Sequence, residues 1–288
     1  MGSSMTKSIQ AQIAVAVALA TINATSTMAD GWRDNAIAPV TNPIFFETPM
    51  IQSEIRPIFL YHQMDSGFLG APVDVRVYAV QLRYAVTERL AIIATKDGYV
   101  DIGKPVNQDG WADLAAGLKY ALFQSEDNQF IVTPGFTIEL PTGNRDVFQG
   151  NGSGELNLFV SAMKGWDNLH ATATLGGRIP FDGDKETSNI RYSGMLDYYV
   201  SKWLIPYVSF NAFTTLSEGN ALAFDSEGFD LINFGSSNAS GETQGAIGGG
   251  FRSRILQNLD FGFGYEWGVI GKNDLFKNRY TFDLIWRF

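Results

Sequence analysis

Apolar and polar residues alternate with a period of two along most of the chain. The last ten residues, 279–288, show the pattern most clearly. Five large apolar side chains fall on one face of this stretch: Tyr280, Phe282, Leu284, Trp286 and Phe288. Because side chains of a β-strand point alternately to its two faces, this stretch predicts a strand with one aromatic and one polar face. In a soluble protein, an exposed strand of this kind would promote aggregation.

The same alternation predicts eleven further strands before the last one, which gives twelve in total. They are expected at 52–63, 73–86, 90–96, 111–123, 129–140, 154–164, 169–179, 189–200, 204–214, 244–255, 259–269 and 279–288. The strand at 90–96 has the weakest pattern, because apolar residues fall on both of its faces.

The connections between these strands alternate in length, which indicates the type of fold. Short connections are expected at 87–89, 124–128, 165–168, 201–203 and 256–258. Long ones are expected at 64–72, 97–110, 141–153, 180–188, 215–243 and 270–278. Outer-membrane barrels have short periplasmic turns and long external loops. We therefore predict an all-β fold, a transmembrane antiparallel up-and-down β-barrel of about 12 strands over residues 51–288, in preference to a soluble β-sandwich.

Residues 1–29 indicate an exported protein. Residues 1–4 (MGSS) are interpreted as a vector-derived remnant. Lys7 precedes an apolar run at 11–22, and Ala29 ends a small-residue site. A charged start, a short apolar core and a small-residue site form a secretory signal peptide. The apolar run is shorter than the roughly 20 residues that a membrane-spanning helix needs.

Residues 30–50 contain three prolines and no clean period. Proline fixes the backbone and removes a hydrogen-bond donor, so this stretch predicts an irregular segment. We expect it to lie either in the periplasm or inside the mouth of the barrel.

The composition is compatible with this fold and excludes several functions. The mean hydropathy of −0.03 is that of a soluble protein, but half of each barrel strand faces a polar interior. The net charge of −9 argues against a nucleic-acid partner, because phosphate binding needs a basic surface. The absence of cysteine removes disulfides and thiolate metal sites. We expect no cofactor and no bound metal.

If the apolar faces contact lipid, the polar faces line a lumen. The charged candidates for this lining are Arg56, Arg83, Asp113, Lys119, Glu139, Arg178, Arg191, Asp197, Arg252, Arg254 and Glu266. Buried charges of both signs need partners, so a wall salt bridge is the simplest role for any single one. Glycines on the same faces leave room, and twelve strands enclose a wider lumen than eight. We predict a narrow water-accessible passage, partly closed by 30–50 or by 215–243.

A barrel hydrolase is the catalytic alternative. Such an enzyme needs a nucleophile with a base in hydrogen-bond reach. The sequence has two histidines, His62 and His170, which the strand order places at opposite rims, and it lacks a Gly-x-Ser-x-Gly motif. We therefore expect no enzymatic activity. The acidic loops could hold Ca²⁺ loosely, but solvated charge explains them more simply.

Two segments carry a resemblance to a known family. Residues 111–120 (WADLAAGLKY) and 136–143 (FTIELPTG), with the aromatic C-terminal strand, resemble the "transporter, phenol-degradation meta-pathway" family of outer-membrane barrels. The similarity covers roughly the second to the twelfth predicted strand. It implies a channel in the outer membrane of a Gram-negative cell, for passive diffusion or uptake of small solutes, including hydrophobic or aromatic compounds.

The C-terminal aromatic residue also resembles the signal that the barrel assembly machinery reads. The expected partners are therefore outer-membrane lipid and lipopolysaccharide, the barrel assembly machinery and a small-molecule solute. A structural or adhesion barrel that acts through its external loops is the alternative function.

Overall fold

A computed structural model of the chain describes residues 31–271 and 275–288. The signal peptide predicted for residues 1–29 lies outside the described residues. No helix within the described ranges has the length and apolar character that crossing a membrane requires.

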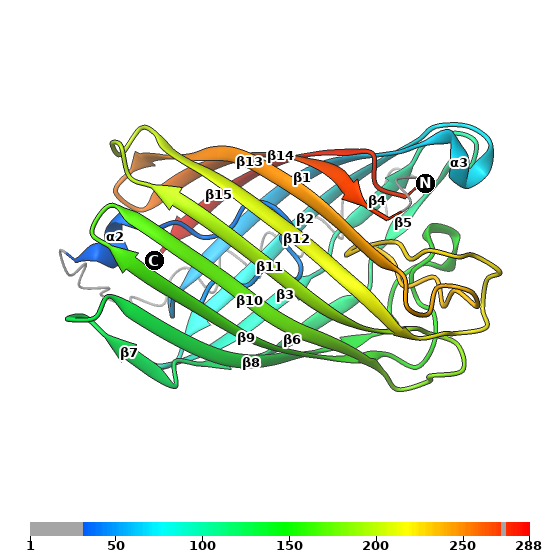
Figure 1. Cartoon of the computed structure of the whole chain (residues 1–288), viewed down its shortest axis with the longest axis horizontal. Coiled ribbons are helices and arrows are strands. Elements are labelled where there is room, and N and C mark those ends of the chain that lie inside the picture. The colour runs from blue at the N-terminus through cyan, green and yellow to red at the C-terminus, as the bar shows by residue number, and fades with distance from the viewer. Residues whose placement is uncertain (1–30, 272–274) are drawn as a thin grey trace, which may run out of the picture.

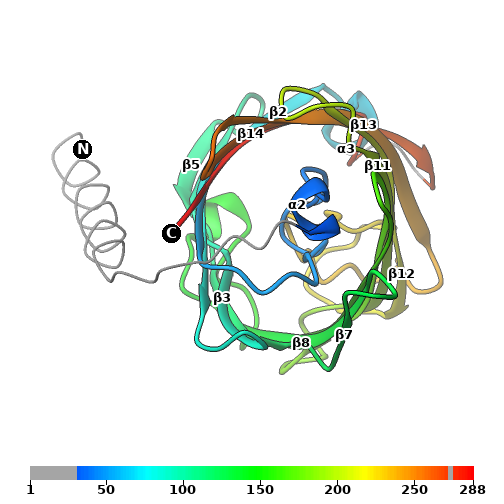
Figure 2. The ribbon, with the colours of Figure 1, turned by 90° about the vertical axis from the view of Figure 1, so that its left-hand side faces the viewer.

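Twelve antiparallel strands form a closed barrel (Figures 1 and 2). The wall strands are β1 (Glu54–Met64), β2 (Val73–Ala85), β3 (Leu90–Lys96), β6 (Leu114–Tyr120), β8 (Phe130–Leu140), β9 (Glu155–Trp166), β10 (Leu169–Pro180), β11 (Ser188–Tyr198), β12 (Ile205–Ser217), β13 (Thr243–Leu256), β14 (Leu259–Ile270) and β15 (Asn278–Arg287). Phe59 of β1 stands opposite both Tyr78 of β2 and Phe282 of β15. Because β1 pairs with the last strand as well as with the second, the ring of twelve wall strands is closed and has no edge strand. The predicted fold and strand number are confirmed.

Three short strands correct the predicted boundaries. The expected loop at 97–110 is wrong, because β4 (Tyr99–Ile102) continues β3 along β2, and β5 (Gln108–Trp111) pairs with β4. A bulge at Asp97 and Gly98, where Gly98 has a φ of +114°, interrupts the alternation and conceals this continuation in the sequence. The predicted strand 111–123 is also divided: β6 ends before β7 (Phe123–Ser125), which pairs with β8.

The two faces of the wall differ as the alternation predicts. On β15, Arg279, Thr281 and Asp283 are buried inside the barrel, whereas Phe282 and Leu284 are exposed on its outer surface. Large exposed apolar side chains recur around the wall: Leu118, Leu158, Leu175, Leu196, Val208, Ile247, Trp267 and Trp286. In water this surface would be unfavourable, whereas lipid is its matching solvent.

The interior of the barrel holds two segments that belong to no wall strand. The first, called the plug here, comprises residues 31–50 and includes the short helix α2 (Trp32–Asn35). It lies within the ring of strands, where α2 is seen in blue (Figure 2). The second, called the long loop, comprises residues 218–242 and connects β12 to β13 at the opposite end (Figure 1).

The plug is irregular because of its prolines, and the wall satisfies its backbone. Pro39, Pro43 and Pro49 have no N–H group and disfavour regular structure, so their neighbourhood must find other hydrogen-bond partners. Side chains of the wall donate to seven plug carbonyls, those of Ala36, Ala38, Pro39, Pro43, Glu47, Thr48 and Pro49. The polar inner face therefore binds a peptide that is part of the same chain.

The small helices and the long loop lie in connections between the wall strands. Helix α3 (Ser66–Leu69) lies between β1 and β2, and the 3-10 helix η1 (Arg145–Val147) lies between β8 and β9. In the long loop, Leu231, Ile232 and Phe234 join a buried apolar cluster with Ile58 and Leu60 of β1. The long loop thus covers an apolar part of the inner wall.

Candidate functional site: the barrel interior

Glycines on β13 and β14 provide the surface on which the plug rests. A Cβ atom at Gly262 would lie 3.0 Å from Val40, and one at Gly248 would lie 2.9 Å from Thr41. Such distances are too short for an unstrained contact, so larger residues would push the plug away. The room that these inward glycines leave is filled by the plug together with the wall side chains of Asp283 and Ser209, which lie closer still.

Asp283 joins two of the predicted lumen residues at the centre of this contact. Its carboxylate accepts hydrogen bonds from Nε of Arg56 at 2.7 Å and from Nη1 of Arg252 at 2.8 Å. Each guanidinium also donates to the plug, Arg56 to the carbonyl of Pro39 at 2.6 Å and Arg252 to that of Ala38 at 3.2 Å. The cluster is sealed, because all three charged side chains are at most 2% exposed.

Glu47 of the plug organises a second cluster. Its carboxylate accepts two bonds from Arg83, at 2.8 and 2.6 Å, and one from Nζ of Lys119 at 2.7 Å. Glu54 pairs with the third nitrogen of Arg83 at 3.1 Å. A bidentate arrangement of this kind is the strongest geometry for a guanidinium and a carboxylate. It fixes the plug to β2 and β6.

The candidates near the long connections also have partners. Arg178 pairs with Glu155 at 3.1 Å, and Glu139 pairs with Lys96. Asp113 accepts hydrogen bonds from backbone N–H groups in the connection between β8 and β9, at 2.8 and 2.9 Å. These contacts hold the wall and a loop together.

Three further candidates lie elsewhere in the interior. Asp197 bonds to Nδ1 of His170 at 2.8 Å. Arg254 donates to the carbonyl of Ala36 at 3.1 Å, and Glu266 accepts from the side chain of Asn211 at 3.0 Å. Of the eleven candidates, ten are buried and Arg254 is half-buried. Their role in a water-accessible passage stays a prediction.

Both histidines have their ring nitrogens engaged by other groups. Nε2 of His170 contacts the carbonyl of Asp167 at 3.0 Å. His62 contacts the carbonyl of Leu275 at 2.6 Å and accepts from Nε of Arg279 at 3.2 Å. Neither ring is free to activate a nucleophile. Within residues 31–271 and 275–288, no group of three or more acidic or histidine side chains could hold a metal ion.

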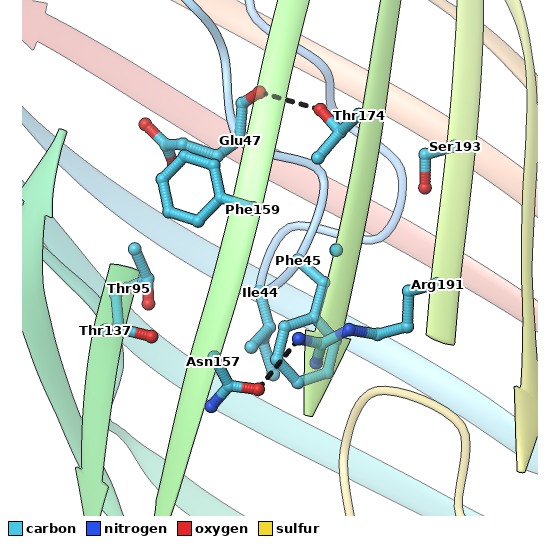
Figure 3. Close-up of a pocket in the computed structure, with 11 residues that line it drawn as sticks. Ile44, Phe45, Glu47, Thr95, Thr137, Asn157, Phe159, Thr174, Arg191 and Ser193 are labelled. Carbon is cyan, nitrogen blue, oxygen red and sulfur yellow. Dashed lines mark hydrogen bonds between the residues drawn. The ribbon is translucent and has the colours of Figure 1, made fainter. Parts of the chain in front are cut away.

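Arg191 differs from the other candidates. Its Nη2 donates to Oδ1 of Asn157 at 2.8 Å, and its guanidinium lies 3.5 Å from the ring centre of Phe45 in the plug (Figure 3). A cavity of about 20 Å³ adjoins this contact, and Gly176 and Ser193 also line it. It has room for about one water molecule. The described part of the chain supplies no carboxylate within 4.0 Å of Arg191.

Sequence reasoning missed Glu47 as a site residue, along with the ion pair of Arg279 with Asp230. Nη2 and Nη1 of Arg279, on β15, donate to the carboxylate of Asp230, in the long loop, at 2.6 and 2.8 Å. A signal for Glu47 was present, since it is the one charged residue between Asp34 and Glu54. A lone charge in a proline-rich segment that enters a barrel is expected to have a partner.

Comparison with known proteins identifies the type of fold. No protein-family model and no curated protein matches the sequence. Among solved structures, the chain is similar to the COG4313 outer membrane channel from Pseudomonas putida F1, with a TM-score of 0.62 and 14% identity over 88% of this chain and 100% of that one. The fold is that of an outer-membrane β-barrel.

Other outer-membrane barrels are more distant from this one. The KdgM porin has a TM-score of 0.45 and 10% identity, over 81% of this chain and 99% of that one. The translocator domain of the autotransporter NalP from Neisseria meningitidis has a TM-score of 0.42 and 11% identity, over 82% and 87%. The predicted location in the outer membrane agrees with the closed barrel and with the apolar side chains exposed on its outer face.

Proposed function

We propose that this outer-membrane barrel is a passive channel for small solutes, of the kind that the phenol-degradation meta-pathway family represents. The observation that carries the proposal is the nature of what fills the lumen. Apolar side chains of the wall fill only part of it, beside the long loop. A separate segment, the plug, occupies another part. The inner face holds the plug through ion pairs and hydrogen bonds, as the contacts of Arg56 and Arg83 illustrate, and through apolar contacts such as those of Phe46. A segment held by exchangeable hydrogen bonds can be displaced, and water and solute can then take its place.

The proposal extends to the surroundings of the barrel. The exposed apolar side chains of the wall would contact outer-membrane lipid, with lipopolysaccharide in the outer leaflet. The polar and charged inner face supports selection by local charge once the lumen is open, because charged side chains replace part of the hydration of a passing ion or solute. The COG4313 protein named above is described as a channel, which agrees with this function.

A reversible tether between plug and wall tests the proposal. The hydroxyl of Thr41 donates to that of Ser209 at 2.9 Å, so a Thr41→Cys, Ser209→Cys pair should form a disulfide in a chain that has no other cysteine. In planar bilayers we expect conductance from the reduced protein and its loss on oxidation, because the plug can no longer leave. Liposome swelling should respond in the same way.

A second cysteine pair serves as the matched control. Thr214 and Thr243 face each other across β12 and β13, with their hydroxyls 2.8 Å apart and without the plug between them. Oxidation of a Thr214→Cys, Thr243→Cys pair should leave conductance unchanged. If the unmodified protein does not conduct at all, a structural or adhesion barrel is favoured.

We further propose that the barrel assembly machinery reads the C-terminal aromatic residue. The backbone N–H of Phe288 donates to the carbonyl of Ser53 at 3.2 Å, so the last residue lies beside the start of β1, where the barrel closes. Deletion of Phe288 should reduce the amount of heat-modifiable barrel in the outer-membrane fraction. Phe288→Tyr, which keeps the aromatic ring, should retain it. An undiminished level after deletion would contradict this role.

A further inference from the structure

The inner face of β10 and β11 carries hydrogen-bond donors that lack acceptors. Arg191 is 7% exposed, and its Nε and Nη1 have no partner among the described residues. Asn189, two residues earlier on β11, is 1% exposed, and both polar atoms of its side chain are likewise unpartnered. Nη1 and Nη2 of Arg178 are in the same situation. A buried donor without a partner destabilises the folded state, and a charged donor does so more strongly.

Strand register places these groups together. Across β10 and β11, Arg178 is paired with Asn189, and Gly176 is paired with Arg191. All four residues are neighbours that face inward. The guanidiniums of Arg178 and Arg191 and the amide of Asn189 therefore surround Gly176, which has no side chain. The adjoining cavity of about 20 Å³ holds about one water molecule, which cannot satisfy this number of donors.

Charge at this position is not balanced locally at Arg191. Arg178 is held by Glu155 at 3.1 Å, whereas Arg191 has the neutral Asn157 as its hydrogen-bond partner. The nearest connection, between β10 and β11, contributes Glu186. Burial, with the neighbouring carboxylate of Glu155, raises the pKa of Glu186 to about 7, so much of it is uncharged at neutral pH. The carboxylates that act on Arg191 from a distance, Glu155 and Glu139, are themselves paired with Arg178 and Lys96. Nε and Nη1 of Arg191 are therefore left for an incoming negative charge.

The ring of Phe45 adds a second recognition element. It lies over the guanidinium of Arg191, with 3.5 Å between the ring centre and Cζ (Figure 3). The ring centre is 5.2 Å from Cζ of Arg178. Aromatic rings stack on guanidinium faces, while the edge of the same guanidinium is suited to two carboxylate oxygens. Phe45 supplies the ring but not the carboxylate.

We propose that Arg191, with Asn189 and Arg178, binds the carboxylate of a small aromatic acid during its passage, and that the solute ring takes the position of Phe45. The inference rests on the proposed channel function and specifies its solute class. When the plug withdraws, Phe45 leaves the guanidinium and the aromatic acid replaces it. The carboxylate then satisfies the donors that the plug leaves without partners.

Binding of benzoate to the purified full-length barrel in detergent tests this site by calorimetry. We expect Arg191→Gln to weaken binding about tenfold or more, because a charge-assisted bidentate contact is lost. Phe45→Ala should strengthen it, because the competing ring is gone. Arg76→Gln, which removes an exposed arginine that pairs with Asp101 and not with the plug, is the control for general charge and should leave binding unchanged.

Two related solutes separate the contributions of ring and charge. Benzyl alcohol has the ring without the charge, and acetate has the charge without the ring, so both should bind more weakly than benzoate. Equal loss of benzoate binding in Arg191→Gln and Arg76→Gln would overturn the assignment. Should Arg191→Gln fail to fold, unchanged benzoate affinity in Phe45→Ala would overturn it instead.

The outcome separates this inference from the channel function. Conductance without benzoate binding would refute the carboxylate site and leave the channel intact. Benzoate binding without conductance would refute the channel and leave a binding site in a closed barrel.

Discussion

Replacing Asp283 with asparagine is expected to lower the free energy of unfolding by about 3–5 kcal/mol, because the change leaves buried guanidiniums without their counter-charge. Asp283 is the carboxylate shared by Arg56 and Arg252, and these side chains are almost completely excluded from solvent. Asparagine keeps the shape and one acceptor oxygen but removes the charge. The urea midpoint, followed by fluorescence of the tryptophans in detergent, measures the effect.

An exposed ion pair provides the control. Arg76 and Asp101 are 3.1 Å apart, and both side chains are 40% exposed. Asp101→Asn should cost less than about 1 kcal/mol, because water already screens this pair. Similar losses for Asp283→Asn and Asp101→Asn would mean that Arg56 and Arg252 are hydrated, as in an open passage.

Placing arginine on the outer face should have the second largest effect. Leu175 lies near the middle of β10 and is 55% exposed on the outer surface. Leu175→Arg should destabilise the barrel by about 2–4 kcal/mol, the cost of a cationic side chain at the midplane of a bilayer. Folding titrations in lipid vesicles report this free energy directly.

The same substitution near the end of the barrel serves as the comparison, because the cost of a charge on the outer face depends on its depth in the bilayer. Leu216, near the end of β12 beside the long loop, is 60% exposed. Leu216→Arg should cost only about 0–1 kcal/mol, because a charge near the interface reaches water. Equal costs at Leu175 and Leu216 would contradict the position of the membrane on this wall.

The wall could be predicted from the sequence because each strand repeats a period of two, which needs only local information. The prediction failed at Asp97 and Gly98, where one bulge shifts the alternation between β3 and β4. The glycines of β13 and β14 correctly indicated space. They could not indicate that Val40 and Thr41 would lie in this space, because the sequence of the plug has no periodic pattern from which its position could be predicted.

The partners of the charged candidates could not be predicted for a different reason. Arg56 is 227 residues from Asp283, and Lys119 is 72 residues from Glu47. Such pairings depend on strand order, on register and on the course of an irregular segment through the lumen. The sequence therefore predicted that charges of both signs face inward, but it could not predict which acidic side chain pairs with which basic one.

The plug is joined to the wall directly, since only residues 51–53 separate it from β1. It is in effect a tethered competitor, present at the order of millimolar effective concentration even after it has left its site. In the proposed channel, a solute would therefore bind against a competitor that cannot diffuse away. Its apparent affinity would equal its intrinsic affinity multiplied by the fraction of time for which the site is vacant. Such a channel would respond little to traces of solute. For a solute whose intrinsic affinity equals that of the plug, it would admit the solute in quantity only when the external concentration approaches the effective concentration of its own tethered segment.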